Sequence, residues 1–322
     1  MKEDVKKIAV IGAGTMGHGI AQSFAQAGYQ VSMMSRTQKT LDRALSLIES
    51  SLSAMVQEGI FDQKLIPTII SRITPTTSIE EAAHDADIAI ETMAEDKDAK
   101  KTVFSQLDAY CPPRTLLASN TTFLNIFDFV ETSRPDKVLI AHWYAPPQII
   151  PLVDVVKGPK TDEANVELMA EILKKMDKKP AVFKKFVSGY LVSRLQFALQ
   201  REVFFLLDND YLSPEELDEA AKWGLALRMM VVGVVQRIDF GGLDLSARNL
   251  EKPSFPPTPL DYKPRKIFEL VKQGCLGVKS GKGFYDYHGR TEAEVCQERD
   301  IKLIRMLKAL KKMSEDGLKL TV

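Results

Sequence analysis

Short apolar runs and longer helical patterns alternate along the first 186 residues. Apolar runs bounded by turn residues predict buried strands, and apolar residues spaced three and four apart predict helices. Strands are expected at residues 8–11, 29–34, 72–74, 87–92, 115–119, 137–142, 152–156 and 180–183. Helices are expected at residues 20–27, 39–58, 63–70, 98–109 and 162–176, with a brief helix after a capping box that begins at Ser78. The alternation predicts an α/β fold with a doubly wound parallel sheet, to which one antiparallel strand can be added.

The pattern changes after Phe186, where strand signals stop and helical patterns continue. Helices are expected at residues 190–207, 213–224, 228–240, 263–273 and 293–313, and the proline-rich segment Pro253–Pro259 is expected to be irregular. The helix at 190–207 is apolar around most of its circumference, so it should be buried inside its domain or at a subunit interface. We therefore expect two domains, residues 1–186 and an all-α domain of residues 187–322.

A glycine-rich turn joins the first predicted strand to the first predicted helix. Its sequence is Gly12-Ala13-Gly14-Thr15-Met16-Gly17, and a second predicted strand follows the helix. In this context Gly12 permits the tight turn, Gly14 lets the backbone approach a pyrophosphate, and Gly17 allows close packing of helix on strand. The phosphates would lie on the amides at the helix N-terminus, next to Thr15 and Met16. A turn without a ligand is the alternative, but the surrounding strand, helix and strand favour a Rossmann dinucleotide-binding domain.

The end of the second predicted strand bears on the choice between NAD and NADP. An NAD site needs a carboxylate there for the ribose 2′-hydroxyl, whereas this chain has Ser35 followed by Arg36. Serine does not repel a 2′-phosphate, and arginine can bind one through its fork of donors. We predict NADP in preference to NAD. The alternative is a solvated arginine beside a site that accepts either cofactor.

Among the four histidines, His142 has the position most suited to catalysis. It ends a predicted buried strand, at the edge where α/β sheets bind ligands. Asp154 lies in the next predicted strand, among valines, where an acid needs a partner. Paired with this carboxylate, the imidazole could exchange a proton with a substrate hydroxyl during hydride transfer. A structural histidine and an unrelated buried aspartate remain the alternative; a metal site is not predicted, because no third ligand is placed by the sequence.

Composition and charge exclude several classes of partner. The 322 residues include 43 basic and 43 acidic side chains, so the formal net charge is zero and neither nucleic acid nor an anionic membrane is expected as a partner. No apolar run is long enough for a membrane span, and the start, MKEDVKKIAV, enters the first strand without room for a signal peptide. Three cysteines without metal-type spacing fit a reduced, cytoplasmic protein.

Taken together, the motifs resemble the 3-hydroxyacyl-CoA dehydrogenase family across nearly the whole chain. The resemblance begins at IGAGTMGHGIAQSFAQAGYQV and continues, in order, through the motifs at 90–100, 119–122, 142–144, 151–158 and 276–287. It implies a catalytic pair at His142 and Asp154. The resemblance further assigns three kinds of position: Ser119 near the substrate carbonyl, Glu95 and Lys100 near the nicotinamide end of the cofactor, and Asn120 among the cofactor-binding residues. It also implies that the second domain is a helical dimerisation domain, so that the protein is a homodimer.

The chain departs from the family pattern at three positions. Asp154 stands where the family has glutamate, and Ala145 and Ser193 stand where it has asparagine near the reacting centre. The stretch 142–161 is more similar to the branch that acts on free hydroxy acids, which includes L-gulonate 3-dehydrogenase, L-carnitine dehydrogenase and a pyridine-carboxylate dehydrogenase. Residues 44–63 contain no lysine or arginine to bind coenzyme A phosphates. The prediction is an NAD(P)-dependent oxidoreductase that interconverts 3-hydroxy and 3-oxo groups on an acyl-CoA or a free acid. The alternative is a dinucleotide-binding protein with weak or lost catalysis, serving as a sensor or structural protein.

Overall fold

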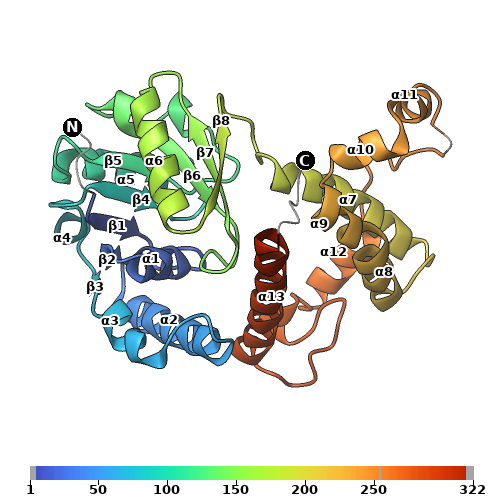
Figure 1. Cartoon of the computed structure of the whole chain (residues 1–322), viewed down its shortest axis with the longest axis horizontal. Helices are drawn as coiled ribbons and strands as arrows, with labels where there is room; N and C mark the ends of the chain where they lie inside the picture. Colours follow the sequence, from blue (N-terminus) through green and yellow to red (C-terminus); the bar gives the residue numbers. More distant parts are fainter. Residues whose placement is uncertain (1–4, 254, 317–322) are drawn as a thin grey trace. The chain divides into compact units, whose positions relative to one another are not determined.

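The chain folds as two compact units, Met1–Tyr190 and Leu191–Val322. The structure is a computed structural model that describes residues 5–253 and 255–316 (Figure 1). The expectation about the first four residues of the chain lies outside this range, as does the part of the irregular segment at residue 254.

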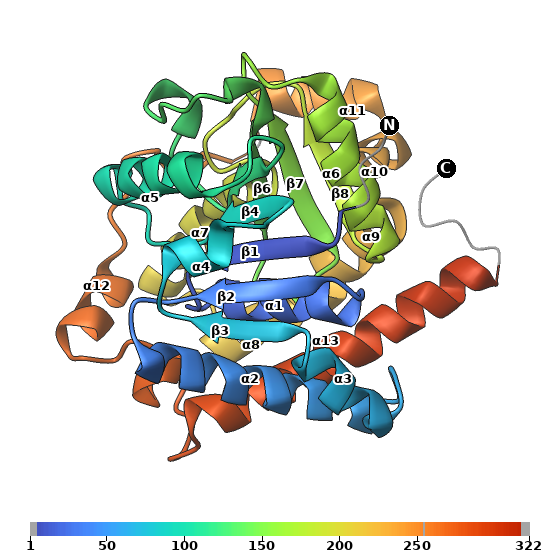
Figure 2. The ribbon, with the colours of Figure 1, turned by 90° about the vertical axis from the view of Figure 1, so that its left-hand side faces the viewer.

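An eight-stranded sheet forms the centre of the first unit, in the order β3-β2-β1-β4-β5-β6-β7-β8. The strands are β1 (Lys7–Ile11), β2 (Gln30–Met34), β3 (Ile73–Thr76), β4 (Ile88–Glu91), β5 (Leu116–Ser119), β6 (Val138–Trp143), β7 (Leu152–Lys157) and β8 (Lys179–Phe183). All neighbours pair in parallel except β6 and β7, which are antiparallel. The predicted doubly wound sheet is confirmed, and the reversal of direction occurs where the chain turns back from β6 into β7. Figure 2 shows β3, β2, β1 and β4 side by side in this sheet.

Helices cover both faces of the sheet because each buried strand presents apolar side chains on both sides. The helices of this unit are α1 (Gly17–Gln26), α2 (Gln38–Gln57), α3 (Ile66–Ile70), α4 (Ile79–Ala83), α5 (Lys97–Tyr110) and α6 (Glu163–Lys175). In β1, Ile8 and Val10 belong to the core beneath α1, α2, α3 and α6, whereas Ala9 and Ile11 belong to the core beneath α4 and α5. The period of two in β1 therefore separates two apolar layers.

The second unit is helical, as predicted, and contains no strand among its described residues. Its α-helices are α7 (Val192–Asp208), α8 (Pro214–Ala220), α9 (Leu227–Val232), α10 (Gln236–Gly241), α11 (Leu243–Glu251), α12 (Arg265–Lys272) and α13 (Glu292–Glu315). The proline-rich segment at 253 and 255–259 is irregular. A capping box at Ser213 and Glu216 begins α8, and α13 begins with another at Thr291 and Glu294.

Several helix boundaries differ from the predicted ones. The helix that begins at Pro214 does not end near Gly224: it continues through η4, a π-helical turn at Ala221–Ala226, into α9. Gly233, with φ of 71°, ends it and interrupts the helix expected at 228–240. A glycine terminates a helix when its backbone turns left-handed, as Gly233 does; Gly224 is not among the glycines with positive φ. The helix α11 was not predicted.

Two local predictions were also wrong in part. At Ser78 the side chain accepts from the Glu81 amide, but the reciprocal half of the expected capping box is absent, because the Glu81 carboxylate binds the Thr76 hydroxyl instead. Burial of the 190–207 helix inside its domain is also wrong. Leu207 is the one buried residue of α7 in the single chain, and Phe197 is 72% exposed.

Candidate active site

The glycine loop has the geometry that a dinucleotide pyrophosphate requires. Gly12 has φ of +116°, and a Cβ there would lie 2.8 Å from Thr92 Oγ1; a Cβ on Gly17 would lie 1.7 Å from the Gly12 carbonyl oxygen. A Cβ on Gly14, in contrast, would meet no atom within 4 Å. No acceptor in the described part of the chain binds the amides of residues 14–16, at the N-terminus of α1. The loop therefore offers open space and free donors to an anion, and a dinucleotide fits it.

The residues predicted to contact the ribose lie at the end of β2. The Ser35 amide donates to the Thr76 carbonyl at 3.1 Å, and Ser35 is buried. Arg36 is exposed, and no described residue forms a hydrogen bond or ion pair with its guanidinium. The next residue, Thr37, caps α2. A cation with its donors free thus stands where the chain leaves β2.

His142 and Asp154 are direct cross-strand partners in the antiparallel pairing of β6 with β7. Imidazole Nδ1 lies 3.3 Å from Asp154 Oδ2, and both side chains are buried. The two residues share one face because side chains alternate along each strand: Ile140 in β6 and Val156 in β7 belong to the core on the α4–α5 side. The sequence predicted the two residues as a pair, and the register of the strands places the two groups in contact.

Three side chains that the sequence analysis did not select complete the surroundings of His142. Thr122 Oγ1 lies 3.1 Å from Nε2, on the opposite side of the ring from Asp154. The Tyr144 hydroxyl donates to Asp154 Oδ2, and its ring meets the imidazole edge-on with centroids 4.6 Å apart. The Tyr190 ring lies 4.8 Å from the imidazole centroid, and its hydroxyl donates to the Thr121 carbonyl at 2.8 Å.

A signal for Tyr144 existed, because it follows His142 by two residues and so lies on the same side of an extended chain. For Tyr190 there was none. Burial raises the pKa of the Tyr190 phenol, and the negative charges of Glu95 and Asp154 raise it further. Tyr190 is therefore a neutral hydrogen-bond donor, not a base, at physiological pH.

Glu95 holds the loop that carries Thr122. Its carboxylate accepts from the Thr121 hydroxyl at 2.8 Å, from the Thr122 amide and from the Phe123 amide at 3.4 Å. Asn120, from the same loop, accepts from the Trp143 amide at 2.7 Å through Oδ1. The loop after β5 is thus fixed both to Glu95 and to the residue after His142.

Ser119 and Lys100 belong to a separate buried cluster around Glu91, at the ends of β4 and β5. Lys100 Nζ lies 2.8 and 2.9 Å from the two Glu91 carboxylate oxygens, and Ser119 Oγ donates to Oε2 at 2.5 Å. All three side chains are buried. In this structure the Ser119 hydroxyl and the Lys100 ammonium are thus engaged with Glu91.

The two positions that lack the family asparagine lie in different units. Ala145 is exposed and follows Tyr144 in the loop between β6 and β7. Ser193 is the second residue of α7, in the second unit.

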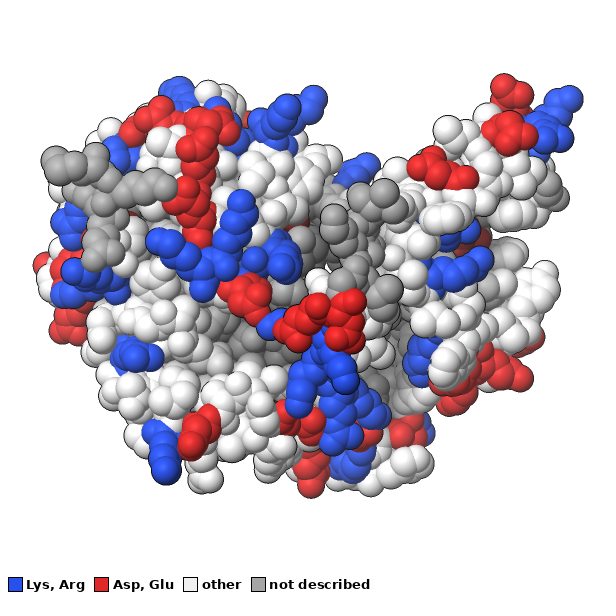
Figure 3. Space-filling view, viewed as in Figure 1, with Lys and Arg blue, Asp and Glu red and all other residues white. Residues whose placement is uncertain are grey.

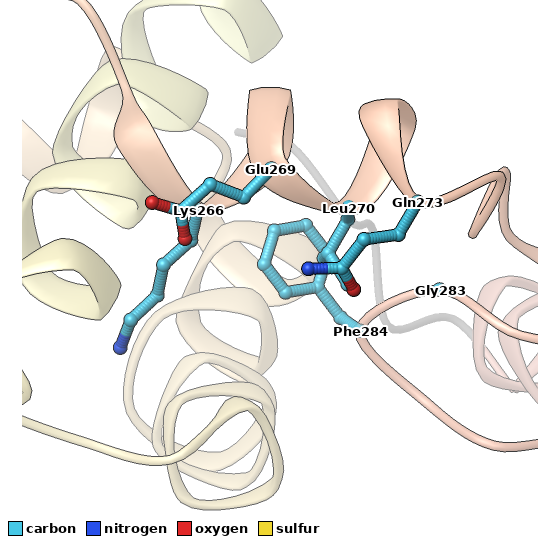
Figure 4. A pocket seen from close by; sticks show the side chains of 6 residues that line it. All are labelled: Lys266, Glu269, Leu270, Gln273, Gly283 and Phe284. Atoms are coloured by element: carbon cyan, nitrogen blue, oxygen red, sulfur yellow. The ribbon is translucent and has the colours of Figure 1, made fainter.

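A shallow pocket of about 220 Å³ lies in the second unit and contains none of the predicted site residues (Figure 4). It is lined by Lys266, Glu269, Leu270, Gln273, Gly283 and Phe284. Its charged groups already have partners: Lys266 binds Asp210 and the Leu207 carbonyl, and Glu269 lies 3.6 Å from Arg265. This pocket therefore adds no reactive group to the site around His142.

Family comparison agrees with this architecture. Residues 7–186 match the model of the 3-hydroxyacyl-CoA dehydrogenase NAD-binding domain, and residues 189–287 match the model of the C-terminal domain of the same enzymes. The chain belongs to the 3-hydroxyacyl-CoA dehydrogenase family. It is accordingly an oxidoreductase with the NAD-binding domain of that family. No helix in the described ranges 5–253 and 255–316 has the length and apolar character to span a membrane.

Individual members of the family are similar over almost the full chain. A 3-hydroxybutyryl-CoA dehydrogenase of Clostridioides difficile is 35% identical over 88% of this chain and 99% of its own. A 5-formyl-3-hydroxy-2-methylpyridine 4-carboxylate 5-dehydrogenase of Mesorhizobium japonicum is 28% identical over 95% of this chain and 98% of its own. The crystal structure of a 5-formyl-3-hydroxy-2-methylpyridine 4-carboxylic acid 5-dehydrogenase, described as an NAD⁺-dependent dismutase, has a TM-score of 0.85 and 28% identity, covering 96% of this chain and 99% of that one. Both acyl-CoA and free-acid enzymes are thus among its relatives.

Proposed function

We propose that this protein interconverts a 3-hydroxy and a 3-oxo group, with His142 and Asp154 as the proton relay. The observation that carries the proposal is the buried contact of 3.3 Å between His142 Nδ1 and Asp154 Oδ2. It lies at the carboxyl end of β6, in a domain whose glycine loop fits a dinucleotide. A histidine held by a carboxylate is the usual arrangement for proton transfer to an oxygen near neutral pH.

The outer nitrogen of the imidazole is the atom that exchanges the proton. Asp154 accepts at Nδ1, which fixes the tautomer and leaves Nε2 as the acceptor for a substrate hydroxyl. In this structure Nε2 contacts the Thr122 hydroxyl at 3.1 Å, so a substrate hydroxyl would bind beside or in place of Thr122. A bound nicotinamide would supply the acceptor or donor of the hydride. The His142 imidazolium then returns the proton when the reaction runs toward the alcohol.

For the cofactor we propose NADP in preference to NAD. The proposal is supported by the exposed guanidinium of Arg36, which has no partner within the described chain, and by the absence of a carboxylate at Ser35. Arg36→Ala should lower kcat/KM for NADPH by about 10- to 100-fold, as expected for loss of charge-assisted hydrogen bonds, and leave that for NADH nearly unchanged. A clear preference of the wild-type protein for NADH would contradict the proposal.

For the substrate we propose a free 3-hydroxy acid in preference to an acyl-CoA. Residues 44–63, which include most of α2, contain no lysine or arginine and carry Glu49, Glu58 and Asp62. This face offers no positive charge to the phosphates of coenzyme A. The similarity to a pyridine-carboxylate dehydrogenase over nearly the whole chain also supports a free carboxylic acid.

A matrix of substrates and cofactors tests these proposals together. Oxidation of NADPH and NADH would be followed with 3-oxo acids presented free and as CoA thioesters. The expected result is turnover with free 3-oxo acids and NADPH, and poor turnover with the thioesters. Higher kcat/KM with a CoA thioester would contradict the substrate proposal without affecting the reaction class.

We also propose that the protein is a homodimer formed through its second unit. Many large apolar side chains are exposed there in the single chain, and apolar surface of this kind is typical of an association site. They include Leu195, Phe197 and Leu199 of α7, Leu227 and Val231 of α9, Ile238 and Phe240 of α10, and Leu243, Leu245 and Leu250 of α11. Light scattering should give twice the mass of one chain, and Phe197→Glu should lower it. Ile60→Glu, at an exposed position of the first unit, is the control. A monomer at micromolar concentration would contradict the proposal.

Surface charge bears on the kind of partner, and the cysteines bear on the cellular location. Lysine, arginine, aspartate and glutamate side chains are interspersed on the face shown in Figure 3, which supports a small-molecule substrate and no nucleic-acid or membrane partner. The three cysteines, Cys111, Cys275 and Cys296, are free. Free thiols support a reducing compartment, and we propose the cytoplasm. Fluorescence microscopy of a tagged protein in its own host would test this placement.

Two observations favour the alternative of a dinucleotide-binding protein with weak catalysis. The Ser119 hydroxyl is engaged by Glu91, and the chain lacks the family asparagines at Ala145 and Ser193. Dinucleotide binding without turnover across a broad panel of 3-oxo acids would favour this alternative. Restored turnover in Ala145→Asn combined with Ser193→Asn would then identify the missing groups as its cause.

A further inference from the structure

The Asp154 carboxylate next to His142 is hydrogen-bonded through one of its two oxygen atoms. Asp154 is fully buried, and its Oδ2 accepts from both His142 and the Tyr144 hydroxyl. Its other oxygen, Oδ1, is buried without a hydrogen-bond partner among the described residues. A buried carboxylate needs several donors to remain ionised. Among residues 5–253 and 255–316, the phenol of Tyr144 is one of two donors to this carboxylate.

The contact between His142 and Asp154 is too long to stabilise the buried carboxylate by itself. Hydrogen bonds between a charged donor and a carboxylate are usually about 2.7–2.9 Å long, whereas Nδ1 and Oδ2 are 3.3 Å apart. Aspartate is also one methylene shorter than glutamate, so the carboxylate lies closer to its own strand. The Tyr144 hydroxyl is the second donor to Oδ2.

We propose that Tyr144 is a positioning residue, whose hydroxyl stabilises the Asp154 carboxylate and keeps it directed at His142. This inference rests on the proposed proton relay and adds a third member to it. Tyr144 also fixes the imidazole directly, because its ring packs edge-on against the His142 ring at 4.6 Å. One side chain thus holds both the base and the carboxylate.

Other titratable groups around the pair do not take this role. The phenol of Tyr190 faces the imidazole but donates to the Thr121 carbonyl, and Glu95 binds the loop at 121–123. On β8 the register partner of Asp154 is Ala181, flanked by Pro180 and Val182, none of which is titratable. Tyr144 therefore supplies the phenol that hydrogen-bonds this carboxylate.

Removal of the Tyr144 hydroxyl has a predictable effect on proton uptake by the pair. The proton-free pair carries a full negative charge on Asp154, and a proton added to the pair balances or neutralises this charge. A donor on Oδ2 therefore stabilises the proton-free pair more than the protonated pair. Without the hydroxyl the pair should hold its proton up to a higher pH.

The pH dependence of kcat/KM for Tyr144→Phe tests this effect. Oxidation of a 3-hydroxy acid needs the proton-free pair, so the acid limb should move to higher pH by about one unit, the value expected for one hydrogen bond to a charged group. A merely structural role would lower kcat/KM at every pH and leave the limb in place. An unmoved limb would overturn the proposal.

Two further variants make the test specific. Tyr190→Phe removes another hydroxyl next to the same imidazole but none from Asp154, so its acid limb should not move. An equal shift in Tyr190→Phe would overturn the proposal. In an Asp154→Asn background, Tyr144→Phe should cause less than about a twofold further loss of kcat/KM, because the carboxylate that the Tyr144 hydroxyl stabilises is absent. Full additivity of the two losses would show that Tyr144 acts elsewhere.

A second readout does not require turnover. The imidazole carbons of labelled histidine can be titrated by NMR in the free protein, with the His142 signal assigned from its loss in His142→Gln. In Tyr144→Phe the midpoint of that titration should rise by about one pH unit. If the wild-type protein turned over no 3-hydroxy acid, the proposed function would fail, and an unmoved midpoint would separately refute the role of Tyr144.

Discussion

Replacement of Gly14 by alanine separates the binding role of the glycine loop from its folding role. A Cβ at this exposed position would meet no atom within 4 Å, and its φ is outside the left-handed region. The methyl group should therefore cause no strain in the fold. It reduces the freedom of the unfolded chain, which stabilises proteins by about 0.4–1 kcal/mol at compatible positions. For a unit of this size, Tm should rise by about 1–4 °C.

The same methyl group should weaken dinucleotide binding, because it stands where the backbone must approach the pyrophosphate. A 10- to 100-fold increase in Kd corresponds to about 1.4–2.8 kcal/mol. At a dinucleotide concentration 100 times the wild-type Kd, the ligand stabilises the wild-type protein by about 2.7 kcal/mol, and a 30-fold weaker Kd leaves about 0.9 kcal/mol. Stability and affinity should thus change in opposite directions.

Thermal unfolding with and without dinucleotide, together with calorimetric titration, measures both quantities. Gly28→Ala at the other end of α1 is the matched control: it also has free space, but its φ of +98° opposes any side chain. This control should lose about 1–2 kcal/mol of stability and keep the wild-type Kd. If Gly14→Ala bound dinucleotide within twofold of wild type, the pyrophosphate would not lie on this loop.

Two further predictions concern charged side chains of the first unit. Lys100→Met leaves the Glu91 carboxylate buried without its cation, so the free energy of unfolding in urea should fall by about 3–5 kcal/mol. The double variant with Glu91→Leu should recover part of this loss. A loss below about 1 kcal/mol would contradict this account of the pair. Burial alone would raise the pKa of Asp108, but hydrogen bonds from Thr132 and Ser133 and the charge of Arg134 lower it below its usual value. Stability from Asp108 is therefore present above about pH 4 and is lost as pH falls through the lowered pKa. Asp108→Asn should lower the free energy of unfolding at pH 7 and flatten the acid side of the stability profile.

The parts of the fold that depend on local pattern were predictable from the sequence. The strand, glycine loop and helix at residues 7–26 are contiguous, so their periodicity and glycines specify them directly. Helix ends in the second unit were less predictable. Gly224 and Gly233 are both glycines within a helical pattern, so the sequence does not show which of them ends the helix. In the folded chain it is Gly233 that adopts a positive φ.

The residues of the candidate site that lie within one motif were predictable from the sequence, but the contacts between motifs were not. His142 and Asp154 stand out individually, but their contact depends on the antiparallel register of β6 with β7, which sequence spacing does not determine. Thr122 reaches His142 because Glu95 binds the loop that carries Thr122. Glu95 and Thr122 are 27 residues apart in the sequence. Such partners depend on the path of loops between strands, and the hydrophobic pattern carries no information about that path.

The proton relay is tested most directly by His142→Gln, measured beside His84→Gln as a control at an exposed histidine. We predict that His142→Gln lowers kcat for the interconversion by about 10²- to 10⁴-fold, the usual contribution of general acid–base catalysis, while its Kd for the dinucleotide stays within twofold of wild type. His84→Gln should change neither quantity. Wild-type turnover in His142→Gln would contradict the assignment of this histidine as the proton-transferring base.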